Sequence, residues 1–167
     1  MNEEIIDQIE ENSEQTQEVV EEKTMTTWLI FSIANKKYAV RSSDVLEIIR
    51  DVAVYKLPFM PSYIEGVLNR RGDPFTVINP RSLIGDTDTT PPPEPLFMIL
   101  KRDDDQLSLH ISDILFFTEM AESDLNLIPG KNDEGFFIGI LDYENEEIPV
   151  LNTNAFENLM RKDLGSA

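Results

Sequence analysis

Carboxylates are the most abundant side chains in this sequence that could do chemistry. The 167 residues include 32 acidic side chains but only one histidine, His110, and no cysteine. With so many carboxylates, some pair falls at acid–base spacing by chance, and the sequence reports neither separation nor burial. We therefore predict no catalytic residue, and keep a small carboxylate-dependent hydrolase only as an alternative.

The sequence lacks the sets of residues that metal binding and nucleophilic catalysis usually require. His110 has no second histidine or cysteine with which to hold zinc or assist a nucleophile, so we expect an exposed or partly packed side chain. The run Asp103-Asp104-Asp105 lacks the spaced ligands and the glycine of a calcium loop, and we expect a solvated turn. No glycine-rich loop could hold a phosphate. The prediction is an absence of metal and cofactor.

A pair of arginines is the more distinctive chemical feature of this acidic chain. The formal net charge is -18, yet Arg70 and Arg71 stand together just before Gly72. Gly72 can adopt the left-handed backbone of a sharp turn, which would present both arginines at a defined hairpin tip. Arginine is enriched in interface hot spots, although exposed arginines also keep a surface soluble. On the residues alone, both interpretations stay open.

The elements that would position these arginines occur twice. Residues 66–79 align without a gap with residues 139–152, each with an apolar strand after a glycine, a polar turn and a second strand. An earlier hairpin over residues 28–40 has its counterpart over residues 96–111. Short strands at close spacing favour small closed barrels, because closure removes exposed strand edges. We predict two such barrels.

The two copies differ in charge. Glu47 and Arg71 lie in the first copy, and the aligned positions of the second carry Phe116 and Glu144. Because the acid and the base change together, we hypothesise that Glu47 and Arg71 approach each other and form a partner-binding patch. A duplicated scaffold with two different surfaces indicates binding in place of catalysis.

The first 24 residues differ in composition from the rest. Residues 1–24 hold nine acidic side chains against one lysine and few apolar groups, which predicts a disordered, solubilising tail. A helix that forms on a partner is the weaker alternative. The proline-rich segment 85–95 is expected to connect two lobes.

The folded domain is expected over residues 25–167. Its barrel lobes would cover roughly 25–85 and 96–153, with exchange of strands between them possible. A short helix is predicted over 154–163, with Asn154 as its N-cap.

Charge and hydropathy exclude several partners. A net charge of -18 repels phosphate backbones and anionic lipid, so we expect no nucleic-acid partner. No apolar run reaches the length that spans a bilayer, so no membrane insertion is expected. The absence of cysteine and of a signal-peptide pattern indicates a cytoplasmic protein.

Two motifs resemble the CheW family of chemotaxis coupling proteins. Val45-Leu46-Glu47-Ile48 matches the family pattern Val-x-Glu-Ile, and the segment from Gly66 to Gly72 matches Gly-Val-x-Asn-x-Arg-Gly. The likeness spans roughly residues 28–159. It implies a mainly β fold of two packed, pseudo-duplicated, five-stranded SH3-like barrels with a short C-terminal helix.

The resemblance also implies a function. It would be a noncatalytic adaptor that joins the cytoplasmic tips of methyl-accepting receptors to the regulatory domain of the CheA histidine kinase. A scaffold for another signalling or pilus-motility complex is the alternative, because the chain departs from the family pattern. The candidate partner-binding residues are Glu47, Gly66, Asn69, Arg70, Arg71 and Gly72.

The clearest departure lies inside the hairpin motif. Arg70 stands where the family has leucine, and Asp73-Pro74 replaces an apolar pair. Burying an arginine without partners is costly, so we expect Arg70 to be exposed. This identifies a divergent member of the family.

Overall fold

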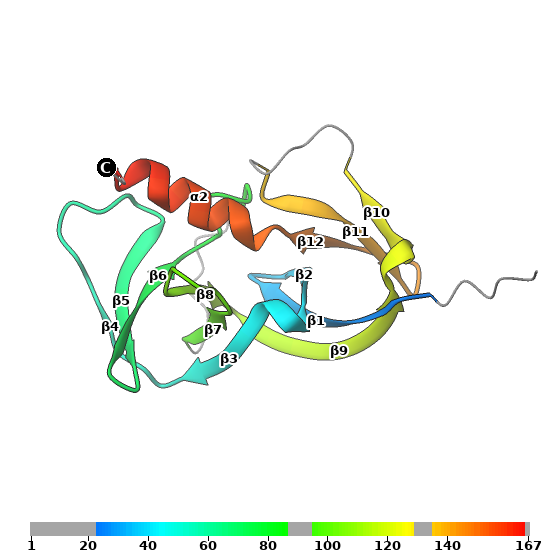
Figure 1. Cartoon of the computed structure of the whole chain (residues 1–167), viewed down its shortest axis with the longest axis horizontal. Helices are drawn as coiled ribbons and strands as arrows, with labels where there is room; N and C mark the ends of the chain where they lie inside the picture. Colours follow the sequence, from blue (N-terminus) through cyan, green and yellow to red (C-terminus); the bar gives the residue numbers. More distant parts are fainter. Residues whose placement is uncertain (1–22, 87–94, 129–134, 166–167) are drawn as a thin grey trace, which may run out of the picture.

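The computed structural model describes residues 23–86, 95–128 and 135–165 (Figure 1). The predicted acidic tail therefore lies almost entirely outside the described residues, as does most of the proline-rich segment. The described chain forms β1 (Met25–Ile33), β2 (Lys36–Arg41), β3 (Val45–Arg50), β4 (Val54–Tyr55), β5 (Ile64–Arg70), β6 (Asp73–Ile78), β7 (Leu96–Leu100), β8 (Leu107–Ile111), β9 (Asp113–Ala121), β10 (Leu125–Leu127), β11 (Phe137–Tyr143), β12 (Glu146–Leu151) and α2 (Thr153–Asp163).

The strands form two sheets that lie side by side (Figure 1). We name the sheet β10-β11-β12-β2-β1-β9 lobe I and the sheet β3-β7-β8-β6-β5-β4 lobe II. The predicted architecture of two packed SH3-like barrels is confirmed. Each sheet counts six strands, one more than expected, and each includes a strand of only two or three residues at one edge, β4 or β10.

Each lobe takes strands from both halves of the chain. Lobe I combines the first hairpin, β1–β2, with β9 to β12, and lobe II combines β3 to β6 with the later hairpin β7–β8. The two hairpins are thus exchanged, and the sheets do not follow the continuous ranges 25–85 and 96–153. Each exchanged hairpin joins its sheet by one parallel pairing, β2 with β12 or β8 with β6, and by one antiparallel pairing, β1 with β9 or β7 with β3.

The exchanged hairpins are buried on both faces. Trp28 and Ile30 of β1 lie in the core of lobe I, whereas Leu29 and Phe31 face a larger core between the lobes. β7 likewise divides its side chains between the core of lobe II and this interlobe core. Burial on both faces explains why β1 and β7 have nearly continuous apolar sequences instead of alternating ones.

The strand β8 is more buried than its alternating sequence predicts. Leu107, Leu109 and Ile111 alternate with polar residues, yet the Ser108 side chain is fully buried and its hydroxyl donates to the Thr76 carbonyl oxygen at 3.1 Å. His110 is partly packed, with Nδ1 2.9 Å from Glu65 Oε1 and its ring 5.0 Å from that of Phe97.

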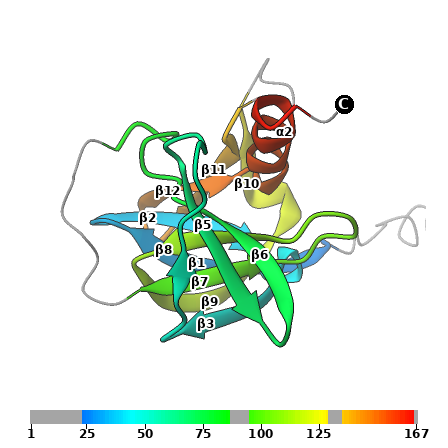
Figure 2. The same ribbon diagram turned by 90° about the vertical axis from the view of Figure 1, so that its left-hand side faces the viewer.

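The helix α2 crosses from lobe I to lobe II (Figures 1 and 2). It begins at Thr153 with Asn152 as N-cap, so the predicted cap Asn154 is wrong by one half-turn. Phe156 and Met160 pack into the interlobe core. At its far end, the Tyr63 hydroxyl donates to Asp163 at 2.7 Å, and burial followed by this hydrogen bond raises the pKa of Tyr63.

Candidate partner-binding hairpin

The tip of the β5–β6 hairpin is a rigid two-residue turn. Arg71 and Gly72 both have positive φ, 51° and 91°, as in the type I′ turns that suit the twist of paired strands. The Asn69 side-chain oxygen accepts a hydrogen bond from the Gly72 N–H at 2.8 Å. The turn predicted from Gly72 is thus present, and Arg71 shares its left-handed geometry.

The β11–β12 hairpin repeats this geometry. Its tip residues, Glu144 and Asn145, have φ of 48° and 64°. Each hairpin also has a register shift in its first strand, beside Gly66 in β5 and Gly139 in β11. The duplication inferred from sequence therefore extends to the backbone of both turns.

Gly66 is buried, and its lack of a side chain leaves room for the neighbouring strand β4. A Cβ on Gly66 would lie 2.1 Å from the Tyr55 carbonyl oxygen, and φ is +149°. A Cβ on Gly139 would meet the Asn126 carbonyl oxygen at 2.6 Å in the same way. Among the candidate residues, Gly66 consequently allows β4 to approach the hairpin and lies beneath the surface.

Glu47 of β3 reaches across to both arginines. Its Oε2 contacts the Arg70 Nε, while its Oε1 lies 3.8 Å from the Arg71 Nη2. The Arg71 side chain is 77% exposed. Glu47 and Arg71 do approach each other, as hypothesised, but Arg70 is the closer partner.

The expectation that Arg70 is exposed is wrong. Its side chain is only 18% exposed, and its guanidinium lies 5.9 Å from the centre of the Phe75 ring. The carboxylate of Glu47 and the ring of Phe75 together offset the loss of hydration. The expectation assumed an arginine without partners, but the free-energy cost of burying Arg70 depends on the groups that contact it.

Lobe I makes the equivalent contact with different chemistry. The rings of Phe116 and Tyr143, which align with Glu47 and Arg70, lie 5.1 Å apart. An edge strand is thus tied to a hairpin in both lobes, by an ion pair in lobe II and by an aromatic pair in lobe I. The two lobes share a scaffold and present different surfaces.

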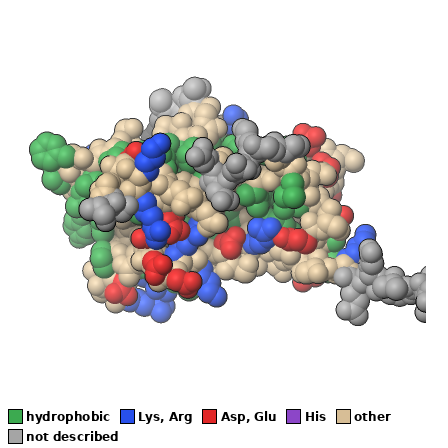
Figure 3. Space-filling view, turned by 45° about the horizontal axis from the view of Figure 1, so that its top comes forward, with side chains coloured by type: hydrophobic (Ala, Val, Ile, Leu, Met, Phe, Trp, Pro, Cys, Tyr) green, Lys and Arg blue, Asp and Glu red, His purple; other side chains and the backbone are tan. Residues whose placement is uncertain are grey.

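Exposed apolar side chains lie on one edge strand of each lobe, and sequence reasoning missed them. β3 and β9 are edge strands on the same side of the molecule (Figures 1 and 2). Leu46 on β3 is 49% exposed, and Leu115 and Phe117 on β9 are 39% and 61% exposed. The available signal was the apolar run Ile114-Leu115-Phe116-Phe117, because a strand directs every second side chain of such a run to its other face. Figure 3 shows the molecule with the α2 side turned forward, and acidic and basic side chains are interspersed on that face.

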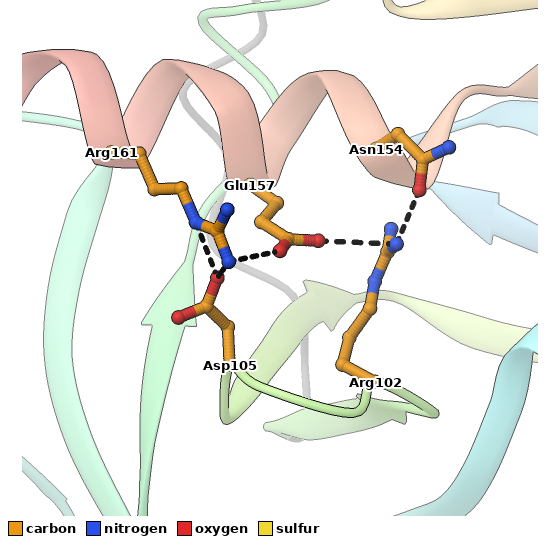
Figure 4. A network of polar contacts seen from close by, with 5 residues as sticks. All are labelled: Arg102, Asp105, Asn154, Glu157 and Arg161. Atoms are coloured by element: carbon orange, nitrogen blue, oxygen red, sulfur yellow. Dashed lines mark hydrogen bonds and ion pairs between the residues drawn. The ribbon is translucent and has the colours of Figure 1, made fainter.

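A close pair of carboxylates lies between helix α2 and the β7–β8 turn (Figure 4). Asp105 lies 2.7 Å from Arg161, and Glu157 lies 2.9 Å from Arg161 and 3.1 Å from Arg102. Burial raises the pKa of Glu157, whereas hydrogen bonding with Glu157 and Arg161 lowers the pKa of Asp105. The expectation of a wholly solvated turn is therefore wrong for Asp105.

This carboxylate pair gives no support to a hydrolase. Both carboxylates are engaged by arginines that fasten α2 to lobe II, which is a structural arrangement. In the part of the chain that the structure describes, no group of three or more histidine, cysteine, aspartate or glutamate side chains could hold a metal. Nor do the described residues include a helix long and apolar enough to cross a bilayer.

Two packed SH3-like barrels with exchanged hairpins define the class of fold, and comparison with known proteins gives the family. The CheW-like domain model matches residues 27–160. The chain therefore belongs to the CheW-like family. It is 22% identical over 135 residues to the chemotaxis protein CheW of Helicobacter pylori, with 80% of each protein covered. Its fold is similar to that of the scaffolding protein TtCheW of Thermoanaerobacter tengcongensis, with TM-score 0.70, 23% identity, and 77% of this chain and 89% of the other covered.

Proposed function

We propose that this protein is a noncatalytic chemosensory adaptor. It couples the cytoplasmic tips of methyl-accepting receptors to the regulatory domain of a CheA-type histidine kinase, and it acts in the cytoplasm. Membership of the CheW-like family supports this role, as do relatives described as a chemotaxis protein and as a scaffolding protein.

The observation that carries the proposal is the rigid tip of the lobe II hairpin. Arg71 projects from a two-residue turn with 77% of its side chain exposed, and Asn69 and Gly72 lie beside it. The turn fixes the backbone from which the arginine projects, and arginine is enriched in interface hot spots. Glu47 and Arg70 support this tip from β3 and β5, and Gly66 holds it against β4.

The exposed apolar side chains of β3 and β9 complete the surface. Leu46 stands next to Glu47 in β3, and Leu115 and Phe117 lie on the equivalent strand of lobe I. Exposed arginine, aliphatic and aromatic side chains are the types that anchor protein interfaces. This surface suits a partner helix or sheet edge.

The test replaces the exposed arginine and measures partner binding. We expect Arg71→Glu to weaken binding of a receptor cytoplasmic fragment or of the kinase regulatory domain, both from the same genome, by at least about tenfold. Titration calorimetry with the purified proteins gives the affinities. Lys36→Glu, an exposed cation of lobe I, is the matched control for the change in charge.

Two outcomes would contradict the proposal. Binding of neither partner by the wild-type protein would remove the adaptor function. Equal affinities of Arg71→Glu and wild type would remove the hairpin tip from the interface. Binding of a pilus-motility complex in place of these partners would favour the alternative scaffold.

A further inference from the structure

Arg70 alters what the lobe II hairpin offers to a partner. The aligned position of lobe I carries Tyr143, whereas lobe II has an arginine that is only 18% exposed. Arg70 contacts Glu47 through Nε, and its guanidinium also lies over the Phe75 ring at 5.9 Å. A planar guanidinium held between a carboxylate and a ring has one fixed orientation.

The two arginines share the carboxylate of Glu47 unequally. Glu47 has two carboxylate oxygens, of which Oε2 contacts Arg70 while Oε1 lies 3.8 Å from Arg71. The Glu47 side chain is 31% exposed. Because Arg70 is both the closer and the less exposed of the two arginines, it balances most of the charge of Glu47. The exposed Arg71 is then only loosely held, because 3.8 Å exceeds the length of a charge-assisted hydrogen bond.

We propose that Arg70 determines partner specificity by neutralising Glu47 from within the protein. The hairpin then presents Arg71, whose charge Glu47 balances only weakly from 3.8 Å, and it selects a partner surface that carries an acidic side chain. The inference rests on the proposed function, since it concerns the partner of the same surface. Arg70 acts through Glu47 and Arg71, so it is a positioning residue.

The alternative chemistry of lobe I supports a role in specificity beyond fold stability. There the equivalent contact between strand and hairpin is made by Phe116 and Tyr143, at 5.1 Å between ring centres. An apolar pair is thus sufficient to fasten this hairpin to its edge strand. The ion pair of lobe II therefore adds a charge effect that packing does not require.

The experiment is a rescue cycle with the full-length protein. Arg70→Leu leaves Glu47 without its near partner, so Glu47 captures Arg71 and competes with an acidic group of the partner. We expect Arg70→Leu to lower affinity for the receptor fragment or kinase domain that the wild type binds by about tenfold. Adding Glu47→Gln to that variant frees Arg71, and affinity should return to within about threefold of wild type.

The rescue separates specificity from structure. A role of Arg70 in packing alone predicts that Glu47→Gln brings no recovery, and that result would overturn the proposal. Equal affinities of Arg70→Leu and wild type would overturn it as well. Lys36→Leu removes the same charge from lobe I and should leave affinity unchanged; an equal loss there would mean a nonspecific effect of net charge and would also contradict us.

A second measurement needs no partner. In NMR spectra of the free protein, the Arg70 Nε–H should exchange slowly with solvent and lose this protection in Glu47→Gln. The Arg71 side chain should gain protection in Arg70→Leu. If the wild type binds neither partner, the proposed function and the specificity claim both fail, while these spectra still decide which arginine occupies Glu47. Protection of Arg71 in place of Arg70 in the wild type would refute the charge assignment itself.

Discussion

Arg70 and Tyr143 occupy equivalent positions in the two hairpins, and each reaches the edge strand beside it. The partner is Glu47 in one lobe and Phe116 in the other. The backbone of the duplicated unit is preserved at these positions, while the chemistry of the contact has changed. A single pair of side chains therefore decides whether a lobe offers charge or aromatic surface.

At the same scale, the two glycines of the lobe II hairpin should differ in their tolerance of a side chain. Gly66→Ala should lower the free energy of unfolding by about 3 kcal/mol or more, because its Cβ would meet the Tyr55 carbonyl at 2.1 Å. Gly72→Ala should cost about 1–2 kcal/mol, since only its left-handed φ opposes a side chain. Urea unfolding of both variants checks this order, and equal costs would contradict the close approach of β4.

Helix α2 is the element that links the lobes outside their sheets. It follows β12 of lobe I, packs Phe156 and Met160 into the interlobe core, and is fastened to lobe II through Arg161 and Asp105. Its amphipathic sequence predicts a helix, but not that its apolar face would cover a seam between two lobes. The helix thus contributes to the relative placement of the hairpin surface and the edge strands.

Removal of the central side chain of α2 should therefore be costly. Phe156 is fully buried, so Phe156→Ala should reduce the free energy of unfolding by about 3–5 kcal/mol. Lys162→Ala on the exposed side of the same helix should change it by less than about 0.5 kcal/mol. Urea titrations followed by tryptophan fluorescence provide the comparison, and a small loss for Phe156→Ala would mean that α2 does not secure the core.

The whole molecule depends on exchange between its halves. Both sheets contain strands from either side of the proline-rich segment. The pairs that join them are β12–β2 and β6–β8, which are parallel, and β1–β9 and β3–β7, which are antiparallel. Neither half alone can complete a sheet or bury the apolar faces of β1 and β7. The two lobes are therefore separate in structure, but the corresponding halves of the chain are not expected to fold independently.

This exchange predicts how fragments behave. Residues 1–86 and 95–167, expressed separately, should each lack a cooperative unfolding transition, because each would expose one doubly buried hairpin. Expressed together, they should form a one-to-one complex that unfolds cooperatively. Circular dichroism and size-exclusion chromatography check both statements. A cooperative transition in either fragment alone would contradict the exchange.

Several features of the site could be predicted because they depend on near neighbours in the chain. Gly72 predicts a tight turn, and the gapless repeat predicts that both hairpins share it. The prediction that Arg70 is exposed failed, since its burial depends on Glu47, twenty-three positions earlier, and on the Phe75 ring. Alternation with Leu107 and Leu109 predicts a polar face for Ser108, but its side chain is fully buried and donates to the Thr76 carbonyl oxygen.

By itself, the sequence determined the acidic charge, the repeated hairpins with their turns and the family to which the chain belongs. These follow from composition and local pattern, in which the residues that interact are close along the chain. Only the tertiary structure decided that the halves exchange hairpins, that α2 packs across the core between the lobes and that Glu47 pairs more closely with Arg70 than with Arg71. Such choices depend on competition among contacts between distant segments, and local patterns carry no information on which of these contacts has the lower free energy.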